Sequence, residues 1–131
     1  MFRMLPLLSA ILACAQAVIA PGYTDRSHKL LSVDDGTVLA RMPRQASCPG
    51  WHAIDAFTRH LPNRDVRVTS QFTVLPDGSV DSVEVIRSTY PSINDAVVQY
   101  LESCTYRPAK DKDGRAAAVR VEWPLYISFV R

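Results

Sequence analysis

The stretch VRVTSQFTVLPDGSVDSVEVIR, residues 66–87, decides the fold of this 131-residue chain. Its first half alternates apolar with polar residues, and Ser70 is the one exception. The apolar set is Val66, Val68, Phe72 and Val74, and the polar set is Arg67, Thr69, Gln71 and Thr73. This period of two is typical of a half-buried strand. Pro76-Asp77-Gly78 then supplies turn residues, and a second β-rich run follows from Val80 to Ile86. The stretch therefore predicts an antiparallel hairpin.

Two helices are predicted on either side of this hairpin, because apolar residues recur there every three or four positions. The first spans Gly50–Leu61 and ends before Pro62. Its apolar residues are Trp51, Ile54, Phe57 and Leu61. The second spans Ser92–Cys104, with Ser92 as the predicted N-cap. Its apolar residues are Ile93, Ala96, Val97, Tyr100, Leu101 and Cys104.

The last run of the chain predicts a long strand with one buried face. The apolar residues are Val119, Val121, Trp123, Leu125, Ile127 and Phe129. Pro124 cannot donate a hydrogen bond to a ladder, so we expect this strand at the edge of the sheet, or bulged there. A long edge strand is an open template for another chain. The residues expected to face outward and contact a partner are Arg120, Glu122, Pro124, Tyr126 and Ser128.

The first residues have the pattern of a secretory signal peptide, residues 1–17. Arg3 provides the positive start, a short apolar run follows, and Ala15-Gln16-Ala17 is a cleavage site, so Val18 is the expected mature start. Two alternatives stay open, an uncleaved inner-membrane anchor and a lipoprotein lipidated on Cys14. The cleaved signal predicts a soluble periplasmic protein, whereas either alternative predicts a membrane-attached one.

Residues 18–47 form a lead-in to the main domain, residues 48–131. Leu30–Val33 and Thr37–Leu39 flank Asp34-Asp35-Gly36, which predicts a short hairpin. An isolated hairpin is marginal in water, so it either packs on the domain or stays an extended lead-in.

Cys48 and Cys104 are an even pair once the signal is removed, and an oxidising compartment favours a structural disulfide between them. A metal site and a reactive thiol are the alternatives. The histidines, His28, His52 and His60, lack the close spacings of a metal site.

The overall composition excludes several classes of function. The net charge of +2 comes from charges of both signs mixed along the chain, which gives no footprint for nucleic acid. No nucleophile motif or carboxylate pair can be assembled. We therefore expect no catalytic residue, metal or cofactor, and a small secreted enzyme or metal-binding protein is the less favoured alternative.

The order of these segments resembles the TonB C-terminal domain family. The residues that carry the resemblance are Phe72-Thr73-Val74, Pro76–Val80, Val83-Glu84-Val85, Arg87-Ser88, Ile93–Ala96, Tyr106–Ala109 and Val121–Leu125. They extend over roughly residues 49–129. The resemblance implies an α+β fold, in which a small antiparallel sheet packs against two helices. It also implies a periplasmic domain that binds outer-membrane transporters by pairing their N-terminal peptide along its last strand.

The chain departs from full-length members of that family, which have a membrane anchor and a long Pro-rich spacer. The expected function is therefore a non-catalytic periplasmic interaction module. Its partner would be a TonB-dependent outer-membrane transporter or another envelope protein, bound by β-strand addition. A membrane-anchored energy transducer is the alternative, and homodimerisation through the same strand is left open.

Overall fold

The computed structural model describes residues 18–25, 27–50, 54 and 65–128. The predicted signal peptide, residues 1–17, lies outside these residues. So do Phe129 and most of the predicted helix Gly50–Leu61. From the apolar face of that helix, the structure describes Ile54, which is helical and buried.

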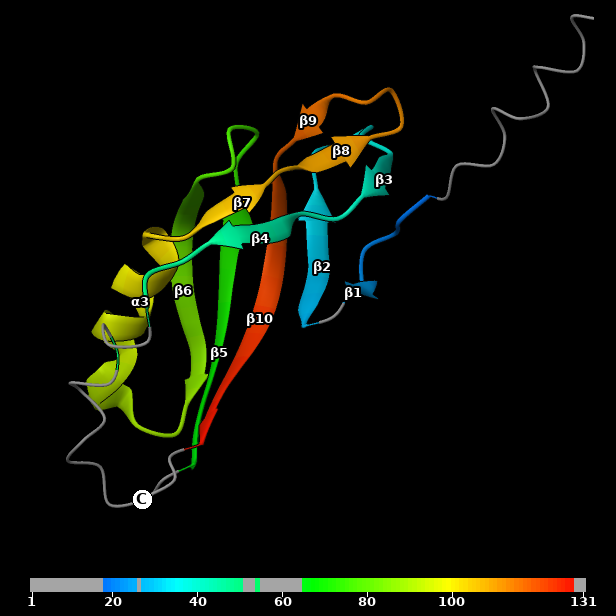
Figure 1. Ribbon diagram of the computed structural model, residues 1–131. Helices are drawn as coiled ribbons and strands as arrows, with labels where there is room; N and C mark the ends of the chain where they lie inside the picture. Colours follow the sequence, from blue (N-terminus) through cyan, green and yellow to red (C-terminus); the bar gives the residue numbers. More distant parts are fainter. Residues whose placement is uncertain (1–17, 26, 51–53, 55–64, 129–131) are drawn as a thin grey trace, which may run out of the picture.

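The centre of the domain is a five-stranded sheet with the strand order β1-β2-β10-β5-β6 (Figure 1). β5 (Asp65–Val74) and β6 (Val80–Ser88) are antiparallel neighbours, so the predicted hairpin is confirmed. In the turn, the Asp77 carboxylate accepts hydrogen bonds from the Ser79 N–H and hydroxyl, and Gly78 has a φ of +89°. The turn residues thus act as their chemistry predicts.

The last strand, β10 (Val119–Ser128), lies inside the sheet, between β5 and β2 (His28–Val33). The prediction of an edge strand along its whole length is therefore wrong. β2 pairs with the first part of β10 because the lead-in supplies Leu30, which is 0% exposed and lies opposite Val121. Burial of this side chain fixes β2 to the sheet.

The lead-in does not form the predicted hairpin between Leu30 and Leu39. β2 pairs with β1 (Thr24–Asp25) and β10, whereas β3 (Leu39–Arg41) pairs with β8 (Ala109–Asp111). The two runs thus enter different sheets. Leu30, Leu39 and Met42 all belong to the main core, so this segment is packed into the domain.

A second layer covers one face of the five-stranded sheet (Figure 1). It contains the 3-10 turn η2 (Pro91–Ile93), the helix α3 (Asn94–Glu102) and a ribbon of β4 (Arg44–Ser47) with β7 (Thr105–Arg107). β9 (Ala116–Ala117) pairs with β8 beside this ribbon.

α3 is the second of the two helices that the sequence predicts, and it is the one α-helix whose bounds lie within the described residues. Of the first predicted helix, Gly50–Leu61, the structure describes Ile54, which is helical. The predicted Ser92 cap is wrong, because Pro91 begins a 3-10 turn that contains Ser92 and Ile93 takes the N-cap position.

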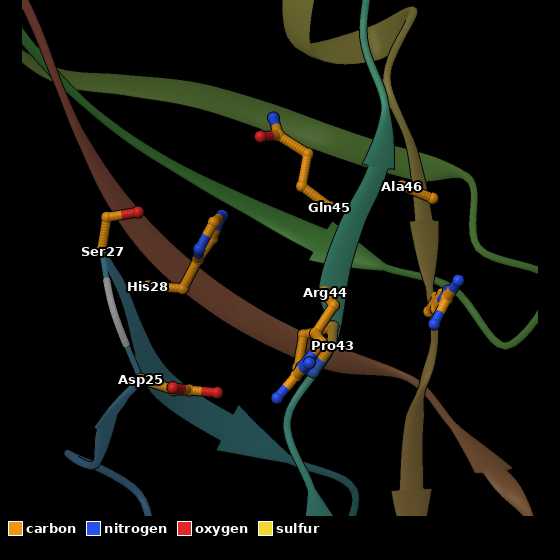
Figure 2. Close-up of a pocket in the computed structure, with 8 residues that line it drawn as sticks. Asp25, Ser27, His28, Pro43, Arg44, Gln45 and Ala46 are labelled. Atoms are coloured by element: carbon orange, nitrogen blue, oxygen red, sulfur yellow. The ribbon is translucent and has the colours of Figure 1, made fainter.

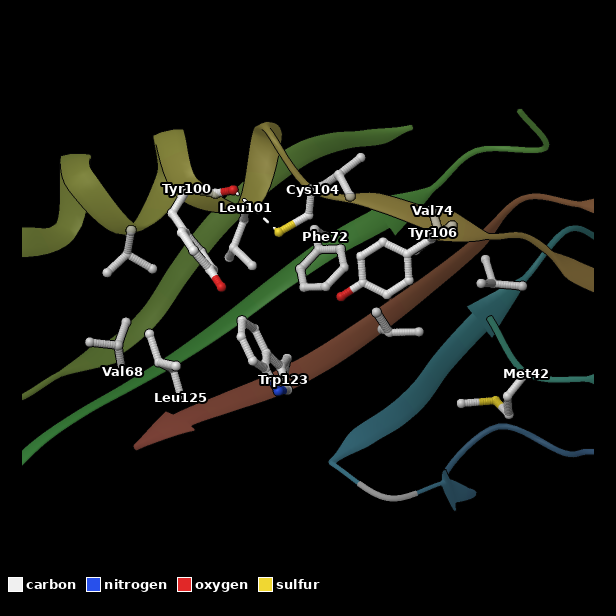
Figure 3. Packing of buried hydrophobic residues seen from close by; sticks show 14 of the residues in the cluster. Met42, Val68, Phe72, Val74, Tyr100, Leu101, Cys104, Tyr106, Trp123 and Leu125 are labelled. Carbon is white, nitrogen blue, oxygen red and sulfur yellow. Dashed lines mark hydrogen bonds between the residues drawn. The ribbon is translucent and has the colours of Figure 1, made fainter. Parts of the chain in front are cut away.

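The core lies between the sheet and this second layer (Figure 3). Phe72 and Val68 project from β5, Leu101 from α3, and Tyr106 from β7 into the same cluster. The alternation predicted for β10 is confirmed over the described side chains, since Val119, Val121, Trp123 and Leu125 are all buried. The opposite face of the sheet carries polar side chains such as Gln71, Thr73, Arg120 and Glu122, which pair with one another across the strands.

Candidate functional site

β10 is paired on both sides in its first half and on one side in its second half. β2 pairs with it from Val119 to Glu122, whereas β5 pairs with it as far as Ser128. Within the part of the chain that the structure describes, no strand pairs with residues 123–128 on the β2 side. We call this side of β10, from Trp123 to Ser128, the open edge.

Arg67 of β5 shows which backbone groups face the open edge. Its N–H donates to Thr89 Oγ1 (3.1 Å) and its carbonyl oxygen accepts from the Thr89 N–H (3.0 Å), so both groups point away from β10. Tyr126 lies opposite Arg67 in the antiparallel ladder. Opposite residues in such a ladder either exchange two hydrogen bonds or turn both groups away from each other. The N–H and C=O of Tyr126 therefore point to the open edge.

Pro124 and Ser128, two residues on either side of Tyr126, face the same way because backbone direction alternates along a strand. The missing N–H of Pro124 thus costs the β10–β5 ladder nothing, which explains why the strand tolerates a proline here. The open edge presents the N–H groups of Tyr126 and Ser128 and the carbonyl groups of all three residues.

Side chains on the uncovered face of the sheet pair across the strands. Arg120 donates to Thr73 Oγ1 (3.2 Å) and forms an ion pair with Glu84 (3.3 Å). Glu122 accepts a hydrogen bond from the Gln71 side chain (3.1 Å). Both Arg120 and Glu122 face outward as predicted, but β2 covers their half of β10. Of the five predicted contact residues, the open edge therefore includes Pro124, Tyr126 and Ser128.

Tyr126 is a large, exposed aromatic residue of β10. The residue is 54% exposed, and the carbon of the Arg67 guanidinium lies 5.3 Å from the centroid of its ring. A partner peptide at the open edge would meet this aromatic and cationic pair on the uncovered face.

His28 and Ser27 lie at the end of the open edge where β2 begins. Ser27 Oγ accepts a hydrogen bond from Trp123 Nε1 (3.1 Å), and the His28 ring stacks on the Trp123 indole with centroids 5.7 Å apart. His28 Nε2 is 2.9 Å from the buried Tyr106 hydroxyl. Burial lowers the pKa of His28 from 6.5 to about 4, although the Asp25 carboxylate acts in the opposite direction. The ring is therefore neutral at pH 7.

Sequence reasoning missed the role of His28. The signal was its position two residues before Leu30, because residues two apart on a strand share a face. A histidine on the buried face of a strand needs a polar partner, and Tyr106 supplies it from a segment 78 residues away.

The other edge of the sheet, β6, is irregular. Its register with β5 shifts twice, between Thr69 and Ser70 and between Gln71 and Thr73, and Ser82 has a φ of +52°. Bulges of this kind twist an edge away from regular pairing. β10 pairs with β5 without any shift, so its open edge is the more regular template of the two.

A disulfide joins Cys48 to Cys104 at the end of the β4–β7 ribbon. Cys104 is buried, and the Gln45 side chain lies 2.7 Å from Cys48 Sγ. The bond links the segment before the predicted first helix to the end of α3, and thereby ties two parts of the second layer to each other.

No group of three or more His, Cys, Asp or Glu side chains among the described residues is placed to hold a metal ion. None of the helices in this part of the chain is both long enough and apolar enough to cross a membrane.

Comparison with known proteins gives a family. The model of the Gram-negative bacterial TonB protein C-terminal matches residues 63–129, half of the chain. Among solved structures, the chain is similar to the solution NMR structure of the Pseudomonas aeruginosa TonB CTD, at 16% identity and a TM-score of 0.47, covering 82% of this chain and 92% of that one. Comparison with curated protein sequences finds no match. Since the family match covers half of the chain and spans β5, β6, α3 and β10, this chain belongs to the TonB C-terminal domain family.

Proposed function

We propose that this chain is a non-catalytic periplasmic interaction module, which binds an extended peptide of an envelope partner at the open edge of β10. Its family consists of non-catalytic interaction domains on the periplasmic side of the envelope, which interact with outer-membrane transporters. The partner proposed for this chain is a TonB-dependent outer-membrane transporter.

The observation that carries the proposal is the direction of the Tyr126 backbone. Unpaired N–H and C=O groups on a regular strand are the groups that an added strand needs. Residues 123–128 span about 20 Å at about 3.3 Å per residue, which accommodates a strand of similar length. At the other end, the open edge is limited by β2, which pairs with β10 as far as Glu122 and buries Leu30.

A photoreactive residue at position 126 tests this proposal in cells. Tyr126 is exposed and lies on the open edge, while Ile86, 41% exposed on the irregular edge β6, is a matched control position. We expect a covalent adduct with an outer-membrane transporter from position 126 and none from position 86. An adduct with a second copy of the chain would mean that the open edge pairs in a homodimer and not with a transporter. Equal capture from both positions would contradict a specific site on β10.

Two variants separate the backbone of Tyr126 from its side chain. Tyr126→Pro removes the edge N–H, whereas Tyr126→Ala removes the ring and keeps the N–H. Because the N–H does not bond to β5, the proline variant should keep its melting temperature within a few degrees. Partner capture from position 128 should fall more in the proline variant than in the alanine variant. Equal losses would mean that the ring alone is recognised.

Localisation to the periplasm through a cleaved signal is part of the proposal. The pattern that supports it is Arg3 with Ala15-Gln16-Ala17. Intact mass of protein from a periplasmic extract should correspond to a start at Val18. A full-length product held in the inner membrane would support the energy transducer instead.

A further inference from the structure

A pocket of 410 Å³ lies beside the end of the open edge where β2 begins (Figure 2). One wall comes from the β1–β2 corner and the other from the β4–β7 ribbon. The polar residues that line it are Asp25, Ser27, His28, Arg44, Gln45 and Arg107. Ser27 and His28 also contact Trp123 of β10, so the pocket adjoins the open edge.

Arg44 and Arg107 are directly opposite each other in the β4–β7 ladder, and both are exposed. Like charges in this position repel each other and destabilise a strand pair. In the described part of the chain, neither guanidinium has a hydrogen bond or an ion pair that would offset the repulsion. Two guanidinium groups that line one pocket are suited to a carboxylate, which Arg can bind through two parallel hydrogen bonds.

The β2 register shows how a docked peptide would reach this pocket. Glu122 pairs with Lys29, so His28 lies beside Trp123 with its side chain on the core face. A docked peptide would add to β10 in line with β2. Beyond His28, its first side chain on the core face would belong to the residue opposite Leu125. This position is about 7 Å from His28, since two strand residues span about 6.6 Å.

We propose that this pocket binds the carboxylate of an acidic side chain on the docked peptide, at the core-facing position nearest to β2. The inference rests on the proposed strand addition. Arg44 and Arg107 bind the carboxylate, and the Gln45 amide offers a further donor. The span from the open edge favours glutamate over aspartate. Asp25 lies on the opposite wall, so the described lining residues carry one net positive charge, and a glutamine at this position binds more weakly.

The first test examines the pocket without a peptide strand. The probe is N-acetyl-glutamate amide, with N-acetyl-glutamine amide as its uncharged match, titrated while backbone amide signals are recorded by NMR. We expect the glutamate probe to shift the amides of Arg44, Gln45 and Arg107, and the glutamine probe to leave them unchanged. Arg44→Gln and Arg107→Gln should each weaken binding at least about fivefold, a conservative figure for loss of a charge-assisted hydrogen bond. Arg115→Gln, an exposed site in another turn, is the control and should have no effect. Equal shifts with both probes, or none, would overturn the proposal.

The second test uses a random hexapeptide library selected on the immobilised protein. We expect an acidic residue to be enriched at one position, and expect that enrichment to disappear with Arg44→Gln while peptides still bind. Tyr126→Pro should abolish peptide capture altogether. Peptides that need the Tyr126 N–H but show no acidic preference would overturn this inference and leave strand addition standing. Peptides captured equally by Tyr126→Pro would overturn strand addition, and with it the docked position proposed for the carboxylate.

Discussion

Replacement of Leu30 by alanine tests whether β2 is a permanent strand of the sheet, which sets the length of the open edge. Leu30 is 0% exposed and lies opposite Val121 in the core. The substitution removes three carbon atoms, worth about 2.4 kcal/mol at about 0.8 kcal/mol for each buried methylene. The remaining cavity adds to this loss, so we expect about 3 kcal/mol, within the range of about 2–5 kcal/mol for buried leucines.

The assay is urea unfolding followed by tryptophan fluorescence, with thermal unfolding as a second measure. A loss of about 3 kcal/mol should lower the melting temperature by at least about 10 °C in a domain of this size. Leu31→Ala is the matched control, because Leu31 is half-buried and should lose less than half as much. Equal and small losses for both variants would show that β2 is loosely attached and that the open edge extends over all of β10.

Three further predictions concern stability. Gly78→Ala should cost at least about 2 kcal/mol, because the left-handed φ of +89° disfavours a side chain and the new Cβ would collide with the Tyr106 carbonyl oxygen. The His28 pKa is lowered from 6.5 to about 4, so the unfolded chain takes up the proton first as pH falls. The contribution of His28 to the free energy of unfolding is therefore complete above pH 6.5 and is lost by pH 4, a change of up to about 3 kcal/mol. The His28→Gln variant should lack this pH-dependent part of the stability. Joint replacement of Cys48 and Cys104 by alanine should lower stability by about 4 kcal/mol in the chain-entropy model of the disulfide.

Each of these predictions has an outcome that contradicts it. An unchanged free energy of unfolding for the Gly78→Ala variant would mean that the turn does not pack under β7. Identical pH profiles for wild-type and His28→Gln protein would mean that the ring is solvated. Two free thiols in unreduced, unfolded protein would mean that Cys48 and Cys104 are not bonded to each other.

Local sequence patterns predicted the parts of the fold whose residues are close in the chain. The β5–β6 hairpin and the buried face of β10 follow from alternation with a turn, and α3 follows from helical spacing. Pro124 correctly indicated an open edge, but only for its own half of the strand.

The remaining features depend on long-range pairing that no local pattern contains. The open edge begins where the pairing of β2 with β10 ends, at Glu122 and Lys29, and beside this point Ser27 contacts Trp123 across 96 residues of sequence. β4 is exposed along its whole length, so it has no alternation to detect, and its pairing with β7 arises only in the folded chain. The Arg44–Arg107 pair is visible only once this ribbon has formed.

Amide hydrogen exchange at Tyr126 tests the central claim most directly. In the free protein the Leu125 N–H, which points to β5, should exchange slowly, whereas the Tyr126 N–H should exchange rapidly. Binding of a selected hexapeptide should slow exchange at Tyr126 and leave Leu125 unchanged. Slow exchange at Tyr126 in the free protein, or rapid exchange at Tyr126 in the complex, would contradict β-strand addition at this edge.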